Sequence, residues 1–275
     1  MVMMLIWGLF SSCISEDHSD CYNRYWLDLS YTGDGAEEIF KEKIDKVSLF
    51  VFDENSSCVF TKSLSQNEIQ QQSTLLPALK EGKYTIVCLA NDYETSLEGL
   101  SAGNWENVLF SGYDPNYLAV TEYIIEPYFK KKQEEWKTAV FACSHYDISV
   151  NVEGAPASEK LPKIILSGIA PSTDFTNSVC GAPVDYQINL TRVGDLLSSS
   201  CNIFRHQSHQ DVCLKVVAED GSELACVNFG EYIAEHNIDC SRQETHIPFK
   251  IVFKSANVEV TFPGWDTDDV IPDFN

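Results

Sequence analysis

The stretch GKYTIVCLAN, from Gly82 to Asn91, indicates the class of fold. Between Tyr84 and Ala90 almost every side chain is apolar, so an extended strand here would have two apolar faces. A strand of this kind is expected in the centre of a β-sandwich.

The segments on either side alternate apolar and polar residues with a period of two, which is the pattern of strands with one buried face. Val47 to Phe52 is a continuous apolar strand candidate. The turn-like run from Asp53 to Ser56 leads from it into Cys58-Val59-Phe60, which predicts a hairpin. Further alternating segments cover residues 25–31, 146–153, 184–190, 212–216, 247–253 and 258–262.

Helices are predicted to be few and short. Ser65 and Glu68 have the spacing of a capping box, which can open a helix that runs to about Leu76. Residues 36–43 and 230–237 are two further candidates. None of them alternates with strands as a βαβ unit requires, so the sequence predicts an all-β protein.

The length of 275 residues suits two domains of about 120–130 residues each. Residues 94–137 are less regular, and we interpret them as a long surface excursion before strands resume at Thr138. We place the domain boundary near residues 143–146 and expect about seven strands in each domain.

Composition and charge restrict the class of partner. Apolar residues make up 44% of the chain and aromatic residues 12%, which is ample for packed cores and argues against disorder. The formal net charge is −22, and such a surface repels phosphate backbones and acidic lipids. This argues against nucleic acid as a partner.

Residues 1–12 resemble a signal peptide. Met1 to Phe10 is an uncharged apolar run too short to span a bilayer, and small residues follow it. Cys13 then resembles the cysteine of a bacterial lipobox, whose thiol receives a diacylglyceryl group. Residues 13–20 would form the lipidated N-terminus and an acidic tether. The alternative is a free or disulfide-bonded Cys13 behind an ordinary signal peptide.

Nine further cysteines are scattered along the chain, so at least one is unpaired. Cys201, His206, His209 and Cys213 have the spacing C-x4-H-x2-H-x3-C. A hairpin of the strand candidates around them would place Cys201 nearly opposite Cys213. That pair fits a disulfide, two core thiols or half of a zinc site. Structural zinc sites usually have tighter cysteine knuckles, so a metal is the least favoured reading.

Other candidate sites are weaker. An acidic tail with aspartates at positions 266, 268, 269 and 273 lacks the glycine and final glutamate of an EF-hand, which favours a solvated tail over a calcium loop. No catalytic or phosphate-binding motif is found, so we predict no enzymatic activity and no cofactor. Trp26, Trp105, Trp136 and Trp265 could line a sugar platform, although such residues more often belong to a core or a domain interface.

Four stretches, taken in their order and spacing, point to a known family. They are the lipobox with its acidic tether, Cys21 and the strand 25–31; IDKVSLFVFD at 44–53; GKYTIVCLAN at 82–91; and PFKIVF at 248–253 with residues 258–265. Together they resemble the fimbrial anchor-subunit family of Bacteroidales-type fimbriae, the FimB type of the type V pili.

This resemblance implies two transthyretin-like β-sandwich domains in tandem, residues 21–143 and 144–275. It implies a surface-exposed outer-membrane lipoprotein, anchored at Cys13, that attaches a strand-complemented fimbria and ends its growth. Its partners would be fimbrial shaft or accessory subunits, bound through β-strand complementation, and the membrane itself. The alternative is a tip adhesin or glycan-binding surface lipoprotein on the same scaffold.

Two features bear on strand exchange. Shaft subunits of such fimbriae are cleaved behind their first strand, often after Arg, whereas this chain has no Arg between Arg24 and Arg192. The first strand is therefore expected to be retained, which suggests a closed groove. After Trp265 only ten residues remain, and Pro272 interrupts them, so the tail is a poor donor strand and the protein would have to accept one. The sequence leaves this conflict open.

Overall fold

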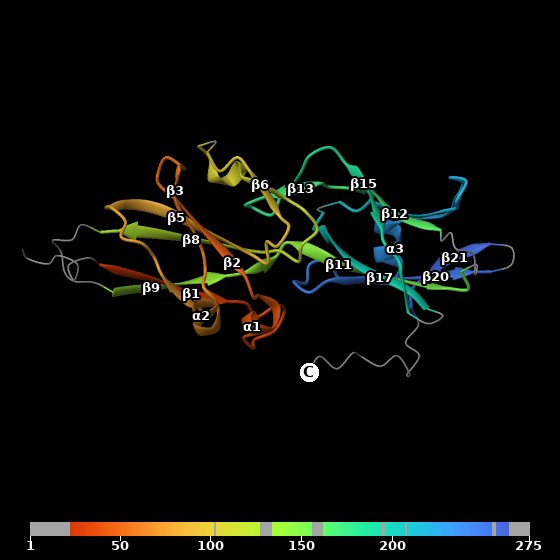
Figure 1. Cartoon of the computed structure of the whole chain (residues 1–275), viewed down its shortest axis with the longest axis horizontal. Helices are drawn as coiled ribbons and strands as arrows, with labels where there is room; N and C mark the ends of the chain where they lie inside the picture. Colours follow the sequence, from red (N-terminus) through yellow and green to blue (C-terminus); the bar gives the residue numbers. More distant parts are fainter. Residues whose placement is uncertain are drawn as a thin grey trace, which may run out of the picture.

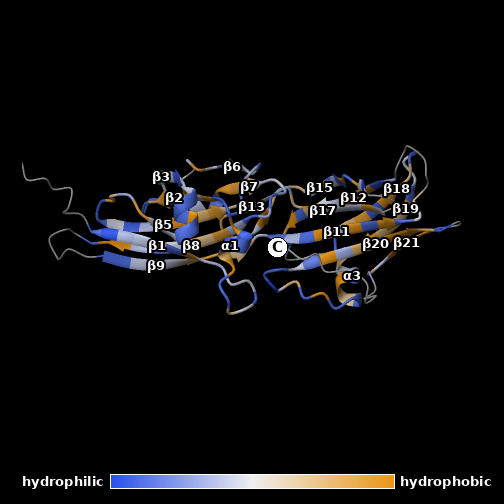
Figure 2. Cartoon of the chain, turned by 60° about the horizontal axis from the view of Figure 1, so that its bottom comes forward, coloured by the Kyte–Doolittle hydropathy of each residue, from blue (hydrophilic) through white to orange (hydrophobic). Residues whose placement is uncertain are grey.

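The computed structural model describes residues 23–101, 103–126, 134–155, 162–193, 196–206, 208–254 and 257–263. Its strands form two β-sandwiches that lie end to end along the long axis of the molecule (Figure 1). Apolar residues recur along the strands of both sandwiches (Figure 2), and the buried ones form a separate core in each. The predicted tandem pair of all-β sandwiches is thereby confirmed.

The first sandwich packs a three-stranded sheet against a five-stranded sheet. The smaller sheet has the order β4 (Ser73–Leu75), β1 (Arg24–Ser30), β9 (Glu134–Val140). The larger has the order β10 (Ala142–Cys143), β8 (Tyr117–Ile125), β5 (Gly82–Ala90), β2 (Val47–Phe52), β3 (Cys58–Ser63). Buried side chains of both sheets, among them Leu27, Leu49, Ile86 and Tyr123, form one core.

Strand β5 has the two buried faces that its sequence predicts, with every side chain from Tyr84 to Ala90 buried. One face belongs to the core of the sandwich, and the other contributes Val87 and Leu89 to a separate cluster. The predicted hairpin of β2 and β3 is confirmed, since the two strands pair in antiparallel register.

The expectation of an irregular excursion over residues 94–137 is wrong in part. β8 lies within that range and pairs with β5 along the whole length of both strands. The segment also holds β6 (Ser96–Glu98), a 3₁₀ turn η2 (Trp105–Asn107) and β7 (Leu109–Ser111). The long strand was missed because Thr121 and Glu122 interrupt its apolar pattern.

The described helices are α1 (Phe40–Lys43), α2 (Gln66–Gln71) and α3 (Phe229–Glu235), close to the three predicted positions. Ser65 and Glu68 form the predicted capping box at the start of α2. The helix ends earlier than expected, because Gln72 adopts a left-handed conformation with φ of 52° and the chain then enters β4.

The second sandwich has one sheet of five strands and one of four. The larger has the order β16 (Thr191–Val193), β17 (Leu196–Phe204), β11 (His145–Glu153), β20 (His246–Phe253), β21 (Val258–Thr261). The smaller has the order β15 (Val184–Ile188), β12 (Lys163–Ile169), β18 (Cys213–Val217), β19 (Glu223–Asn228). Its core includes Ile148, Leu166, Leu214 and Phe249, with Phe229 and Tyr232 contributed by α3.

A small sheet crosses between the two sandwiches (Figure 1). Its order is β14 (Val179–Cys180), β13 (Ser172–Asp174), β7, β6, so strands from the second half of the chain pair with strands from the first half. Phe175, next to β13, is fully buried against Phe50, Phe52 and Phe110. Backbone pairing and a shared apolar cluster therefore join the two sandwiches.

The loop before β20 makes a second connection between the sandwiches. The carboxylate of Asp34 accepts hydrogen bonds from the backbone N–H groups of Gln243 and Glu244. The Glu244 carboxylate in turn accepts from the Tyr31 hydroxyl and from Lys43 Nζ, the latter at 2.7 Å. From the other side, the Arg205 guanidinium donates to the carbonyls of Cys240, Arg242 and Gln243 at 2.6, 2.7 and 3.1 Å.

Candidate functional site

The first strand occupies the centre of the smaller sheet of the first sandwich. Tyr25, Leu27, Leu29 and Tyr31 are all buried, with Leu27 at 0% exposure. β1 pairs with β4 in antiparallel register and with β9 in parallel register along its whole length. β1 thus fills the groove between β4 and β9. A donor strand from another subunit could bind there only by displacing β1.

Side-chain contacts hold β1 in its seat as well. The hydroxyl of Tyr123 donates to the carbonyl of Trp26, and the side-chain amide of Gln72 donates to the carbonyl of Leu29 at 3.1 Å. On the outer face, Trp26 and Trp136 stack, and Trp26 Nε1 donates to Glu134 at 2.9 Å. These contacts come from Gln72 at the end of α2, from β8 and from β9, so side chains of three different elements hold the strand.

The four tryptophans considered for a platform separate in the structure. Trp26 and Trp136 lie side by side on the outer face of β1 and β9, and Trp136 is 51% exposed. Trp105 packs against the apolar cluster at the junction of the sandwiches. Trp265, like the acidic tail from Asp266 to Asp273, lies outside the described residues.

The predicted hairpin around Cys201 and Cys213 is wrong. Cys201 lies in β17, which pairs with β11 and β16, whereas Cys213 lies in β18, which pairs with β12 and β19. The two strands belong to different sheets of the sandwich, and both cysteines are free thiols. Burial raises the pKa of Cys201 to about 12, so its thiol is protonated at neutral pH.

The two histidines between these strands are engaged in internal hydrogen bonds. His206 Nε2 accepts from the backbone N–H of Ala170 at 3.2 Å, and His209 Nε2 lies 3.1 Å from the hydroxyl of Tyr146. Burial, with a smaller effect of His209, lowers the pKa of His206 to about 4. Across the described residues, no group of three or more His, Cys, Asp or Glu side chains is placed to hold a metal ion.

One Cys–His pair is buried at the junction of the sandwiches. Cys143 Sγ lies 3.3 Å from His145 Nδ1. Burial raises the pKa of the Cys143 thiol to about 12 and lowers the pKa of His145. Both groups are therefore neutral at pH 7, which is the opposite of an activated thiolate–imidazolium pair.

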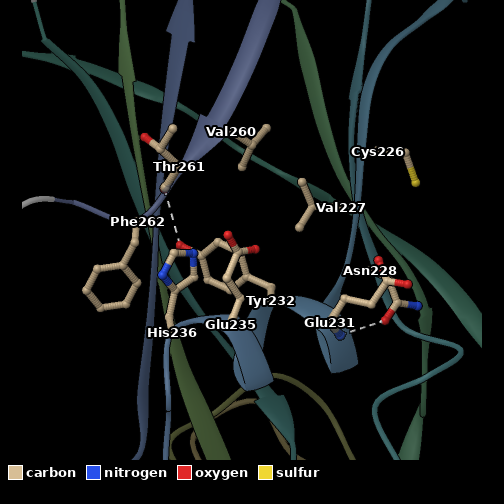
Figure 3. A pocket seen from close by; sticks show the side chains of 10 residues that line it. All are labelled: Cys226, Val227, Asn228, Glu231, Tyr232, Glu235, His236, Val260, Thr261 and Phe262. Carbon is tan, nitrogen blue, oxygen red and sulfur yellow. Dashed lines mark hydrogen bonds between the residues drawn. The ribbon is translucent and has the colours of Figure 1, made fainter.

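The second sandwich has an open groove along one side (Figure 3). The edge strands β19 and β21 form its walls and α3 closes one end, around a volume of about 390 Å³. It is lined by Cys226, Val227, Asn228, Glu231, Tyr232, Glu235, His236, Val260, Thr261 and Phe262. Sequence reasoning did not identify this groove, because the order of strands in a sheet decides which strands lie at an edge.

Comparison with known proteins identifies the family. The sequence profile of the Mfa2 family, the fimbrillin-A associated anchor proteins Mfa1 and Mfa2, matches residues 17–270. The chain belongs to this anchor family. The resemblance to Bacteroidales fimbrial anchors is therefore confirmed for nearly the whole chain, and the family places the protein with fimbriae at the cell surface.

Solved structures share the fold of this anchor-family protein. The fimbrial anchor protein Mfa2 from Porphyromonas gingivalis has a TM-score of 0.69 at 15% identity, covering 88% of this chain and 98% of that one. A candidate adhesin from Bacteroides ovatus also has a TM-score of 0.69, at 14% identity, with coverage of 89% and 95%. A candidate polysaccharide-binding protein from Bacteroides thetaiotaomicron has a TM-score of 0.65 at 12% identity, with coverage of 84% and 91%. No match is found among curated proteins.

Cys13 of this anchor-family protein lies outside the described residues, as do the predicted signal peptide 1–12 and tether 13–20. The described chain begins at Asn23, directly before β1. No helix among the described residues is long and apolar enough to cross a membrane.

Proposed function

We propose that this anchor-family protein is an outer-membrane lipoprotein that holds a fimbria to the cell and ends its growth. The observation that carries the proposal is that β1 fills the groove between β4 and β9. In a polymer that grows by strand exchange, each subunit must present an empty groove to the next donor strand. A subunit whose groove holds its own first strand cannot be extended at that groove.

The attachment half of the proposal rests on the N-terminal sequence. Residues 1–12 serve as a signal peptide, Cys13 carries the lipid, and residues 13–20 form the tether. The sandwiches then comprise residues 21–143 and 144–275. Two or three acyl chains, at about 0.8 kcal/mol per buried CH₂, attach a protein stably where a single chain does not. A retained β1 is necessary here, because it keeps Cys13 covalently joined to the folded protein.

The attachment is tested with a Cys13→Ser strain and a matched Cys21→Ser strain. In the Cys13→Ser strain we expect fimbriae to appear in the culture medium and labelling by an alkyne palmitate to be lost. The Cys21→Ser strain should behave as wild type. Fimbriae that stay on the cells of the Cys13→Ser strain would contradict attachment through this residue.

Growth termination is tested by varying the amount of protein. Fimbriae measured by electron microscopy should become longer when the gene is deleted and shorter when it is overexpressed. The reason is that more terminating subunits compete for each growing end. Unchanged lengths at both levels would argue that the protein attaches fimbriae without ending their growth.

The second candidate is a tip adhesin or glycan-binding lipoprotein on the same scaffold, and one observation favours it. Trp136 is half-exposed at the edge of its sheet, and an exposed indole can stack on a sugar ring. Binding on a glycan array that is lost in Trp136→Ala and kept in Trp105→Phe would support this function. An array without any ligand would leave anchoring as the sole function.

A further inference from the structure

We propose that the groove between β19, α3 and β21 binds an extended segment of a fimbrial subunit that combines apolar side chains with Lys or Arg. This inference rests on the proposed function and names the surface through which it acts. The sequence suggests both that the first strand is retained and that the protein accepts a strand from a partner. Because β1 occupies the groove between β4 and β9, a partner strand would have to bind at another place, such as the groove between β19 and β21.

Each wall of the groove is an edge strand, and the two strands approach each other along part of their length, so an added segment would pair with one of them. Within the described part of the chain, β19 pairs with β18 alone and β21 pairs with β20 alone, so each strand ends its sheet. An edge strand presents unpaired N–H and C=O groups to which an extended segment can add as a further strand. Leu224 of β19 is 41% exposed, which leaves apolar surface beside this edge uncovered.

The floor of the groove is apolar and fixed in position. Val227 and Val260 are half-buried and approach the groove from opposite walls (Figure 3). The buried ring of Tyr232 lies beneath them, and its hydroxyl donates to the carbonyls of Pro248 at 2.6 Å and Thr261 at 3.2 Å. His236 stacks on Phe262 at a centroid distance of 4.8 Å. A floor held in this way costs little further ordering when a ligand binds.

The charge of the groove selects the partner. Glu231 and Glu235 are both exposed on α3 and line the opening, and the lining residues include no Lys or Arg. A basic side chain on the incoming segment would be attracted to these two carboxylates. The net charge of −22 strengthens this attraction, because few cationic groups of the protein oppose it. The chain's own tail is disfavoured as occupant, since residues 264–275 hold four aspartates and no Lys or Arg.

The first test measures binding of the full-length protein to the purified fimbrial shaft subunit of the same organism by biolayer interferometry. We expect the double variant Glu231→Lys, Glu235→Lys to bind at least about tenfold more weakly than wild type, and Glu231→Gln, Glu235→Gln to lie between them. The control is Glu94→Lys, Glu98→Lys, which makes the same change in net charge on exposed residues in and next to β6, away from the groove. It should bind as wild type does.

The second test uses the exposed thiol of Cys226, which lines the groove, as a reporter. Burial and the neighbouring Cys213 raise the pKa of the Cys226 thiol, so maleimide labelling is followed at mildly alkaline pH by mass spectrometry of its peptide. It should proceed in the isolated protein and be at least about fivefold slower with saturating shaft subunit. Labelling of Cys226 that is equally fast with and without saturating shaft subunit would contradict the proposal.

The outcomes separate this inference from the proposed function. If wild type binds the shaft subunit while the Lys double variant binds equally well, or while Cys226 stays unprotected, the groove proposal is wrong and anchoring stands. If wild type binds no fimbrial subunit, both proposals fail.

Discussion

The indole rings of Trp26 and Trp136 are stacked, with centroids 4.9 Å apart and planes 5° apart. The two residues are direct partners in the parallel register of β1 and β9. The stack therefore fastens the first strand on its solvent side, opposite the buried row of Tyr25, Leu27 and Leu29. Side-chain contacts thus hold β1 on both faces of the sheet.

Loss of this stack should loosen the first strand. Trp136→Ala is expected to lower the free energy of unfolding by about 1 kcal/mol, because an aromatic pair contributes roughly that amount beyond area burial. Trp136→Phe should keep most of the stability, since a ring remains. Urea denaturation measures both variants, and a Trp136→Ala protein as stable as wild type would show that the stack contributes nothing.

Two glycines with left-handed backbones form a matched pair. Gly168 has φ of 81°, and a Cβ there would lie 2.1 Å from the carbonyl oxygen of Asp211. Gly221 has φ of 87° with open space around it. Gly221→Ala should cost only about 1 kcal/mol of backbone strain. Gly168→Ala should cost clearly more in the same thermal or urea unfolding experiment, because the backbone itself must move. Equal losses would contradict the close approach at Gly168.

Glu68 should make stability depend on acid pH. Burial alone would raise the pKa of Glu68, but hydrogen bonds from Lys62, Thr74 and Ser65 outweigh it and lower the pKa to about 2. A carboxylate whose pKa is lower in the folded state stabilises the protein above its unfolded pKa, about 4.5, and loses that contribution as the pH falls toward 2.

The free energy of unfolding should therefore decrease over that range by about 1–2 kcal/mol more in wild type than in Glu68→Gln, since solvent screens part of the interaction of this partly exposed carboxylate. Urea titrations at several pH values from 5 to 2 would measure the difference between the two proteins. Parallel pH curves would show that Glu68 has no depressed pKa.

Arg205 should be irreplaceable by Lys. Its guanidinium donates to three carbonyls of the loop before β20, and a single ammonium cannot reach all three. Arg205→Lys should lower the free energy of unfolding by about 2–3 kcal/mol through unsatisfied carbonyls. Arg192→Lys, at an exposed position, is the control and should be neutral. Equal stability of the two variants would show that the three hydrogen bonds of Arg205 do not stabilise the fold.

Local patterns predicted local structure well. The alternation of Tyr25, Leu27 and Leu29 predicted the buried face of β1, and the capping box predicted the start of α2. Each of these signals reports whether a side chain is inside or outside, or whether a helix can begin. That information is carried by neighbouring residues in the sequence.

Partners distant in sequence could not be predicted in the same way. The strands around Cys201 and Cys213 follow each other in the chain, yet they lie in different sheets. The pairing of β13 with β7 across the two halves has no local signal either, since three residues pair over a separation of more than sixty. The groove depends on sheet order in the same way, because only that order makes β19 and β21 edge strands.

The position of β1 between β4 and β9 has a mechanical consequence. Any pull on the chain upstream of Asn23 acts along β1, whose ladders with β4 and β9 run parallel to the force. In that geometry the hydrogen bonds of both ladders are sheared together, whereas a strand pulled sideways unzips one bond at a time. A fold loaded in this direction resists tension at its N-terminus, which is the direction of load that the proposed lipid attachment at Cys13 would impose in flowing liquid.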